Sequence, residues 1–364
     1  MAERQPLKLG TSGAETFAST DTLPRTTLPA GAVISPSQIT ADQDNYNPSG
    51  LSTADVVRLD FDANGRSITG LATWTDGRPK ILVNTSANYG VLAAEHPDST
   101  NTNRFAGPCD HILPPAAAVT VYPDPTTSRI RVLSNSFSLH ELGVLYKGMY
   151  LNVPTSSATA GDNPHLVFAT SGTGASVAAK AAGANFQRGL AQSTGTTSTG
   201  VAAIGALKDG EAVRWGDTHV IAFATVRIPV LSTSGQRFTA DFAFSLINGS
   251  LAALPNRSSV GIKYSDNLNS GKWLLYNVDH STTEASTDSG VSVAANTAYQ
   301  LLLVVDKQLS ESRFFINGTY VGRVATNMPT STILAGVRTD IVSSVGTTAK
   351  ELVTTNIGFA LVSN

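Results

Sequence analysis

The chain has one cysteine, Cys109, among 364 residues. A single thiol excludes an internal disulfide framework and any metal site built from several cysteines. Cys109 lies in the turn-like segment Gly107-Pro108-Cys109-Asp110. We expect it to carry no chemistry.

Charge is also scarce. Only 14% of the residues are charged, against about a quarter in an average globular protein, and the formal net charge is −2. The shortage of Glu, Lys and Arg argues against a coiled coil. The absence of a basic stripe argues against a nucleic-acid partner, because such a stripe is what displaces phosphate counterions. Hydrophobic residues reach 41%, too many for a disordered chain, so a β-rich globular protein remains.

Long apolar runs are missing as well. No run approaches the roughly 18 apolar residues of a membrane span. The first residues, Met1-Ala-Glu-Arg-Gln-Pro, have no apolar stretch like the core of a signal peptide. We therefore expect neither membrane insertion nor secretion.

Residues 1–33 show no sustained hydrophobic period. They contain the extended and turn-like segments Thr22-Leu23-Pro24 and Thr27-Leu28-Pro29, in which proline disfavours helix for the residue before it. Such a segment cannot bury a core of its own. We predict an extended N-terminal arm that gains order along a partner surface.

Residues 34–134 alternate short apolar runs with turns, which predicts a small all-β domain, a sandwich or a barrel. Asn64-Gly65 separates candidate strands at 56–61 and 67–71, a pattern typical of a hairpin. Further strands are expected at 81–83, 118–122 and 129–133.

Residues 135–165 read as a linker, and residues 166–364 predict one jelly-roll β-sandwich domain. The clearest hairpin signal is Asn317-Gly318 between two β-branched and aromatic runs. No helical unit recurs between the strands, so a parallel α/β fold is not expected. The remaining candidate strands of this domain are 220–231, 238–245, 260–264, 273–278 and 299–305.

Several short sequence segments resemble segments of a known protein family. Residues 39–52, Ile-Thr-Ala-Asp-Gln-Asp-Asn-Tyr-Asn-Pro-Ser-Gly-Leu-Ser, resemble the opening of a domain that recurs in tailed-bacteriophage virion proteins. Residues 6–29 are similar to short N-terminal segments of phage proteins. The C-terminal zone resembles a concanavalin-like jelly-roll domain of phage tail and minor virion proteins. The matching blocks in the small domain are 57–59, 68–71, 77–78, 82–84, 103–105 and 128–133, and those in the jelly roll are 226–229, 271–273, 287–291, 315–318 and 346–348.

The resemblance implies a structural, non-enzymatic virion protein, assembled in the cytoplasm of a bacterial host. On this reading it is a tail-fibre or tail-tip subunit, a homotrimer or similar oligomer, that docks onto other virion proteins through residues 1–33 and meets a host-surface glycan. One alternative is a capsid decoration or head-fibre protein that reinforces the shell. A second is a tailspike polysaccharide depolymerase.

The depolymerase alternative needs two carboxylates that face each other about 5–10 Å apart, one with a raised pKa. The acids of the C-terminal zone mostly lie in turns, and no strand carries a closely spaced Glu pair. The six histidines never show the tight spacing of a local metal motif. The segment 60–71 begins like a calcium-binding loop but has Leu71 where the bidentate Glu belongs. We expect no metal and no cofactor.

Sugar binding without cleavage needs an exposed aromatic ring together with amides or carboxylates that bond to hydroxyl groups. The candidate strand 273–278 and the turns on either side of it supply such residues. Trp273 begins that strand, and we expect it to pack in the core. The candidate glycan-binding residues are Asp266, Asn267, Tyr276, Asp279 and His280.

Overall fold

The computed structural model describes residues 7–10, 13–16, 32–72, 74, 77–107, 109–136, 146–152, 166–180, 189–206, 213–214, 219–246, 258–279, 283–306, 310–329 and 334–362. The described residues form β-strands joined by turns, with two single-turn 3-10 segments, η1 (Asn101–Asn103) and η2 (Asn269–Gly271). This confirms the all-β class. None of the helices in these ranges is long and apolar enough to cross a membrane.

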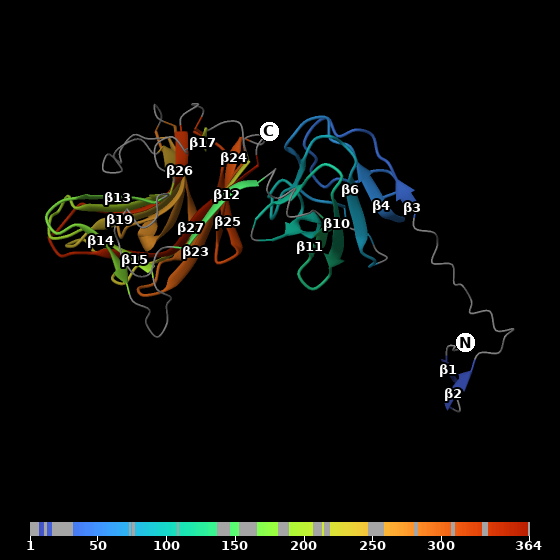
Figure 1. Ribbon diagram of the computed structural model, residues 1–364, viewed down its shortest axis with the longest axis horizontal. Helices are drawn as coiled ribbons and strands as arrows, with labels where there is room; N and C mark the ends of the chain where they lie inside the picture. Colours follow the sequence, from blue (N-terminus) through green and yellow to red (C-terminus); the bar gives the residue numbers. More distant parts are fainter. Residues whose placement is uncertain are drawn as a thin grey trace.

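The N-terminal region contains a short antiparallel hairpin of β1 (Leu7–Gly10) and β2 (Gly13–Thr16). Neither strand joins another sheet of the described structure (Figure 1). The rest of residues 1–31 lies outside the described residues, so the docking role predicted for the arm stays a prediction. Residues 32 and 33 belong to a strand of the next domain.

Two sheets build the small domain (Figure 1). The larger has the order β3 (Ala32–Ile34), β4 (Ala54–Leu59), β6 (Lys80–Asn84), β10 (Ala118–Asp124), β11 (Arg129–Ser136) and β8 (Phe105–Ala106). The smaller contains β5 (Arg66–Ile68), β7 (Gly90–Leu92) and β9 (His111–Leu113). Apolar side chains from both, among them Leu59 and Leu92, bury one core.

The expected hairpin at Asn64-Gly65 does not form. Gly65 makes a turn with φ 80°, but the strands on either side, β4 and β5, belong to different sheets. Each pairs in parallel with a strand that is distant in sequence, β4 with β3 and β6, and β5 with β7. The buried side chain of Phe61 and the Asp62–Arg66 ion pair of 2.6 Å hold the connection. The turn therefore passes the chain between sheets.

The larger domain is a jelly roll of two facing sheets. One has the order β14 (Ser176–Lys180), β15 (Gly189–Ser193), β27 (Glu351–Val362), β18 (His219–Arg227), β23 (Ala298–Asp306), β24 (Glu311–Ile316) and β25 (Thr319–Val324), with β12 (Tyr146–Asn152) also on β27. The other has the order β13 (Leu166–Ser171), β16 (Val201–Ala206), β26 (Leu334–Ser343), β19 (Phe238–Leu246), β20 (Ser259–Tyr264), β21 (Lys272–Val278) and β22 (Ala285–Ser292), with β17 (Val213–Arg214) on β26.

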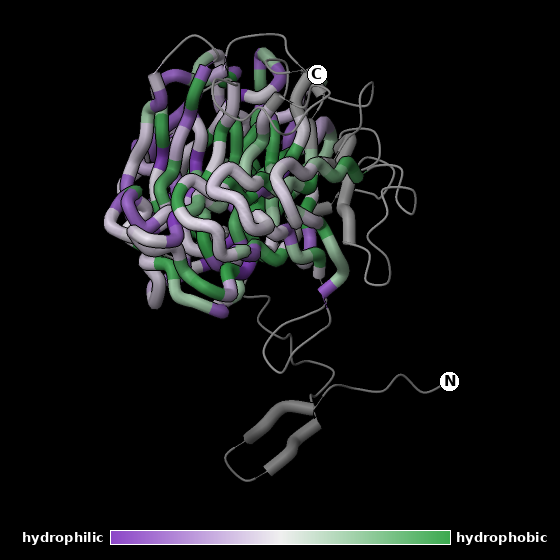
Figure 2. Tube along the Cα trace, turned by 90° about the vertical axis from the view of Figure 1, so that its left-hand side faces the viewer, coloured by the Kyte–Doolittle hydropathy of each residue, from purple (hydrophilic) through white to green (hydrophobic). Residues whose placement is uncertain are grey.

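Alternation of side chains explains the core of this domain. In β19, Phe238, Phe242 and Phe244 point inward and are buried. Trp273 is also a core residue, as expected, and its ring meets Tyr264 and Tyr299 edge to face at centroid distances of 6.0 and 5.5 Å. Hydrophobic segments run through the body of the strands in Figure 2, and hydrophilic ones concentrate toward the outside.

Two local predictions for the jelly roll have different outcomes. Asn317-Gly318 forms the expected hairpin between β24 and β25, with positive φ at both residues (51° and 75°). Residues 146–152, which the sequence placed in the linker, instead form β12 and pair antiparallel with β27. The apolar run Met149-Tyr150-Leu151 is short and its neighbours contain Ser, Pro and Gly, so the sequence pattern does not indicate a strand at this position.

A buried ion network joins the two domains. Asp110 of the small domain accepts hydrogen bonds from both terminal nitrogens of Arg313 in β24, with Nη1 2.8 Å from Oδ1. His219 Nε2 lies 3.0 Å from the same carboxylate. Burial alone would raise the pKa of Asp110, but Arg313 and His219 outweigh it and hold that pKa well below its usual range. The pair is therefore ionised inside the junction.

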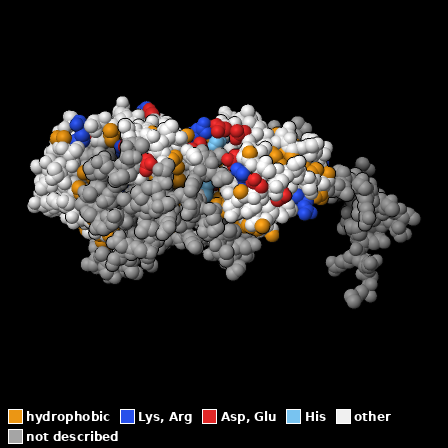
Figure 3. All heavy atoms as spheres, turned by 90° about the horizontal axis from the view of Figure 1, so that it is seen from above, with side chains coloured by type: hydrophobic (Ala, Val, Ile, Leu, Met, Phe, Trp, Pro, Cys, Tyr) orange, Lys and Arg blue, Asp and Glu red, His pale blue; other side chains and the backbone are white. Residues whose placement is uncertain are grey.

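Further contacts extend this junction. His96 Nε2 of the small domain lies 2.7 Å from Oε1 of Glu311, and Arg323 reaches Asp98 at 2.9 Å. Seen from above, charged side chains of both signs and a histidine gather where the domains meet (Figure 3). Ala94 of the small domain also packs with Val304 and Phe315 in a small apolar cluster. The junction thus combines apolar packing with ion pairs, which together join the two domains.

Candidate functional site

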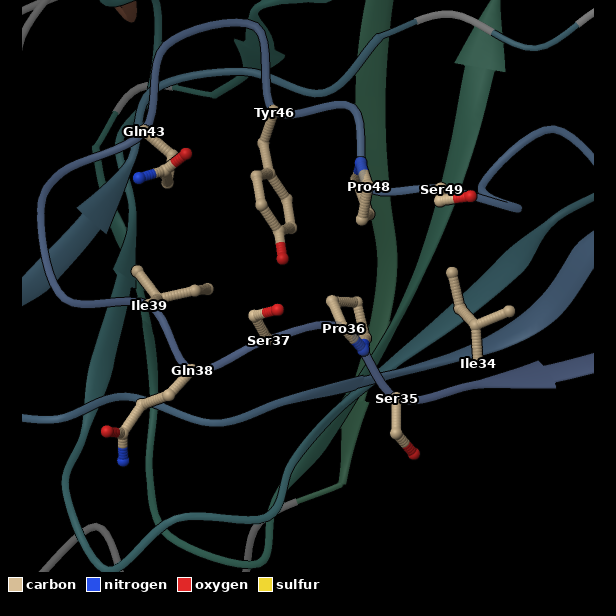
Figure 4. A pocket seen from close by; sticks show the side chains of 10 residues that line it. All are labelled: Ile34, Ser35, Pro36, Ser37, Gln38, Ile39, Gln43, Tyr46, Pro48 and Ser49. Atoms are coloured by element: carbon tan, nitrogen blue, oxygen red, sulfur yellow. The ribbon is translucent and has the colours of Figure 1, made fainter.

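A hollow of about 450 Å³ opens on the small domain beside the end of β3 (Figure 4). We call it the Tyr46 groove, because the ring of Tyr46 points into its middle. No charged side chain lines it. Its lining residues are Ile34, Ser35, Pro36, Ser37, Gln38, Ile39, Gln43, Tyr46, Pro48 and Ser49.

Tyr46 is held in place by its neighbour Asn45. Asn45 adopts φ 47°, a conformation that Asn tolerates better than most residues. Its side-chain oxygen accepts hydrogen bonds from the backbone N–H of Thr100 (2.8 Å) and from the amide of Asn103 (2.8 Å). The backbone N–H of Tyr46 donates to the carbonyl of Gly70 at 2.7 Å. The backbone that carries the ring is therefore held in place.

The floor of the groove is apolar. Ile39 is buried, and Ile34, Pro36 and Pro48 are half-buried around the Tyr46 ring. Burial raises the pKa of Tyr46 above its usual value, so the hydroxyl keeps its proton at neutral pH. The groove therefore offers the face of one aromatic ring, with the Tyr46 hydroxyl at its end as a hydrogen-bonding group.

Polar atoms around this floor have unused capacity. Gln38 and Gln43 each use their amide N–H, toward Asp60 (3.3 Å) and the carbonyl of Ala41 (2.9 Å). Their amide oxygens accept no hydrogen bond within the described part of the chain. The same holds for the hydroxyls of Tyr46 and Ser37. Neutral donors and acceptors thus surround an aromatic face.

This arrangement suits a neutral saccharide. Sugars present apolar faces, which stack on aromatic rings, and hydroxyl groups, which bond to amides and hydroxyls. Residues 39–52 carry the resemblance to a phage domain, but nothing in the sequence alone distinguishes Tyr46 as a binding residue. The run Tyr46-Asn47-Pro48 indicates an aromatic residue beside a turn, but only the fold shows that Ile34 and Ile39 flank its ring (Figure 4).

The residues singled out in the jelly roll do not come together. Asp266 follows β20 and Asp279 follows β21, and because these strands are antiparallel the two acids lie at opposite ends, about 20 Å apart. Asp266 accepts hydrogen bonds from Ser232 (2.5 Å) and Arg237 (3.1 Å), and Asn267 beside it is exposed. Asp279 accepts one from Ser258 at 3.0 Å.

Tyr276 and His280 complete that set. Tyr276 is only 3% exposed, and its hydroxyl donates to Asp241 at 2.7 Å. Its ring therefore presents no open face to a ligand. His280 lies outside the described residues. A role for Asp266, Asn267 or Asp279 in sugar contact stays a prediction, but these residues do not share one site.

A carboxylate pair that the sequence did not reveal lies on the outward side of β19 and β26. Asp241 and Asp340 are direct cross-strand partners, which places their Cβ atoms about 5 Å apart. Arg338 contacts both, at 3.1 and 3.4 Å. The pKa of Asp340 is raised to about 7, because burial and the charge of Asp241 raise it by more than Arg338 lowers it. The two side chains are 8% and 2% exposed.

One buried set of metal-type ligands lies at the domain junction. Asp110, His219 and Asp306 place ligand atoms within 4.8 Å of one another. The guanidinium of Arg313 lies 3.6 Å from Asp306 and also pairs with Asp110. Its positive charge is shared between the two carboxylates, so the set forms an ion network with Arg313.

No protein-family model matches the chain, and no curated protein matches it in sequence. Among solved structures, it is similar to the Emp46p carbohydrate recognition domain in potassium-bound form (9% identity, TM-score 0.40, 57% of this chain and 94% of that one). It is also similar to a Bacillus licheniformis β-glucanase (11% identity, TM-score 0.38, 60% of this chain and 98% of that one). A third similar structure is of botulinum neurotoxin type C, whose cell entry is described as dependent on interaction with two ganglioside molecules. This chain matches about half of that one (11% identity, TM-score 0.40, 61% of this chain and 49% of that one). Likenesses this distant carry no argument about function.

Proposed function

We propose that this chain is a structural protein of a tailed-bacteriophage virion, a tail-fibre or tail-tip subunit that binds a host-surface glycan. The observation that carries the binding function is the Tyr46 groove, where the Tyr46 ring lies among amide and hydroxyl groups with unused hydrogen-bonding capacity. The phage assignment is supported by the resemblance of residues 39–52, which contribute Gln43, Tyr46, Pro48 and Ser49 to the groove.

The proposal moves sugar contact from the jelly roll to the small domain. The jelly-roll candidates are dispersed or, in the case of Tyr276, buried. The groove gathers the required groups in one place. Its lack of charge favours hydroxyl-bearing sugars without acidic groups, because no cation lines the groove to neutralise an anion.

Calorimetric titration of the full chain with polysaccharide extracted from host cells tests this function. Tyr46→Ala should weaken binding about tenfold, since it removes the stacking face. Tyr122→Ala is the matched control, because Tyr122 is a half-buried tyrosine on β10 outside the groove. Equal affinities for the two variants would remove the groove from sugar binding. Tighter binding of a proline-rich peptide than of any saccharide would make the groove a peptide site.

The arm is proposed to attach the subunit to the virion. Deletion of residues 1–31, which spares β3, should leave a folded protein that no longer enters particles. Normal incorporation of this deletion would refute docking by the arm. Immunogold labelling of whole virions would show the position, and label on the head would identify a capsid decoration protein.

A depolymerase activity has one observation in its favour, the Asp241–Asp340 pair with its raised Asp340 pKa. Both carboxylates are buried and bound to Arg338, however, so we assign them a structural role. Incubation with host polysaccharide should release no reducing ends. Release that disappears in Asp340→Asn would instead establish the enzyme.

A further inference from the structure

A second hollow, of about 530 Å³, lies at the junction of the two domains. We call it the junction cleft. The small domain contributes one wall and the tip of the β24–β25 hairpin the other. Its lining residues are Glu95, Arg104, Ala106, Gly107, Thr127, Arg129, Arg131, Gly318, Thr319 and Tyr320. Neither domain alone contains this cleft.

Three arginines and one glutamate line the cleft, and ion pairs with Glu95 and Asp124 offset the charges of Arg129 and Arg131. Arg129 is fixed by Glu95, whose carboxylate accepts from Nε at 2.8 Å, and by the carbonyl of Asn101 at 3.0 Å. Arg104 donates to the carbonyls of Ser99 (2.9 Å) and Pro97 (3.1 Å). Carbonyl partners leave the full charge of Arg104 in place. Both guanidinium groups are therefore held in position, and Arg104 supplies the net positive charge of the lining.

Arg131 is the most accessible of the three. Its side chain is 47% exposed, and Nε pairs with Asp124 at 2.5 Å. Nη2 makes one long contact of 3.5 Å with Thr127, while Nη1 has no partner within the described residues. Arg131 therefore has N–H groups free to bind an oxyanion.

The opposite wall adds a neutral donor. The ring of Tyr320 packs edge to face on Phe315 with centroids 5.7 Å apart. Burial, followed by the charge of Glu311, raises the pKa of Tyr320 to about 12, so its hydroxyl remains protonated. That hydroxyl makes no hydrogen bond within the described part of the chain. Hydroxyls of Thr127 and Thr319 lie on the same lining.

We propose that the junction cleft binds a saccharide that carries carboxylate or phosphate groups. The cations and the Tyr320 hydroxyl meet the oxyanion, and the threonine hydroxyls meet sugar hydroxyls. A saccharide is favoured over a single-stranded nucleic acid because Tyr320 is the one aromatic residue of the lining, whereas such nucleic acids stack successive bases on several aromatic rings. The site is separate from the Tyr46 groove and does not depend on it.

The test measures fluorescence anisotropy of labelled probes with the full chain. The probes are a galacturonic acid hexamer, a glycerol-phosphate hexamer, a neutral galactose hexamer and a six-nucleotide single-stranded DNA. We expect binding of at least one acidic probe, weakened at higher salt, and at least tenfold weaker binding of the neutral hexamer. Which acidic probe binds tells carboxylate from phosphate recognition.

Variants assign the binding to the cleft. Arg131→Gln should weaken the acidic probe about tenfold, and Tyr320→Phe should weaken it several-fold without removing the ring. Arg58→Gln is the matched control, because Arg58 is an exposed arginine on β4 outside the cleft. Tyr46→Ala should leave acidic binding unchanged, which separates this site from the groove. Binding of neither acidic probe, equal loss in Arg58→Gln and Arg131→Gln, or tightest binding of DNA would overturn the proposal.

Discussion

Asp110 of the small domain and Arg313 of the jelly roll, 203 positions apart in sequence, form a bidentate ion pair that is fully buried at the domain junction. Both side chains are 0% exposed. Removal of one partner from such a pair leaves an uncompensated charge in a low-dielectric setting. The pair therefore makes the two domains depend on each other, and it keeps the walls of the junction cleft in place.

Asp110→Asn should destabilise the folded protein by about 3–5 kcal/mol, because Arg313 and His219 then lose their shared anion. Urea denaturation followed by tryptophan fluorescence measures this change. Asp62→Asn, which removes an exposed ion pair with Arg66, should shift the midpoint far less, because water screens that pair. Equal shifts in the two variants would contradict a stabilising role for the buried pair.

A fragment that begins at residue 137 should be less stable than the full chain and should self-associate. It would expose Val304 and Phe315 on the outer side of the jelly-roll sheet and leave Arg313 without Asp110. Size-exclusion chromatography with light scattering and thermal unfolding measure both effects. A fragment with the melting temperature of the full chain, and no tendency to associate, would show that the junction adds nothing to stability.

Stability should fall as the pH rises toward 7 because of Asp340. Its folded-state pKa is raised, so the proton stabilises the fold fully below the ordinary aspartate range, and this contribution is lost as the pH rises through about 7. Asp340→Asn mimics the protonated acid. The free energy of unfolding of this variant, relative to that of the wild type, should therefore increase by about 1 kcal/mol per pH unit between pH 5 and 7. Denaturation at several pH values measures the gain. Asp288→Asn, at an exposed acid with a lowered pKa, should show no such trend.

Trp273→Leu should lower stability by about 2–4 kcal/mol without altering saccharide affinity. The indole is 1% exposed and packs between two tyrosine rings, so its loss leaves a cavity in the jelly-roll core. Calorimetric melting and titration with host polysaccharide are the paired measurements. Unchanged melting with weakened binding would instead make Trp273 a contact residue.

Local signals in the sequence predicted local structure well. The β-branched and aromatic runs around Asn317-Gly318 gave the correct hairpin, because a two-residue turn sets its own partner strands. The same dipeptide at Asn64-Gly65 misled, since parallel partners distant in sequence decided where β4 and β5 pair. Core packing of Trp273 was also predicted correctly, because this residue begins an apolar strand.

The sites were beyond this kind of prediction. The Tyr46 groove needs Ile34 and Pro36 to fold over a ring ten or more positions away, and no periodicity encodes that approach. The junction cleft needs Arg131 and Tyr320 from different domains. The jelly-roll candidates, in contrast, were neighbours in sequence, and the antiparallel pairing of β20 and β21 sent Asp266 and Asp279 to opposite ends.

The most direct test of the account is binding of the fluorescently labelled full chain to intact host cells, with unrelated cells as the comparison. We predict saturable, host-restricted binding that is about tenfold weaker for Tyr46→Ala and unchanged for Tyr122→Ala. Binding that does not distinguish host from unrelated cells, or that is equally strong for wild type and Tyr46→Ala, would contradict recognition of a host glycan by the Tyr46 groove.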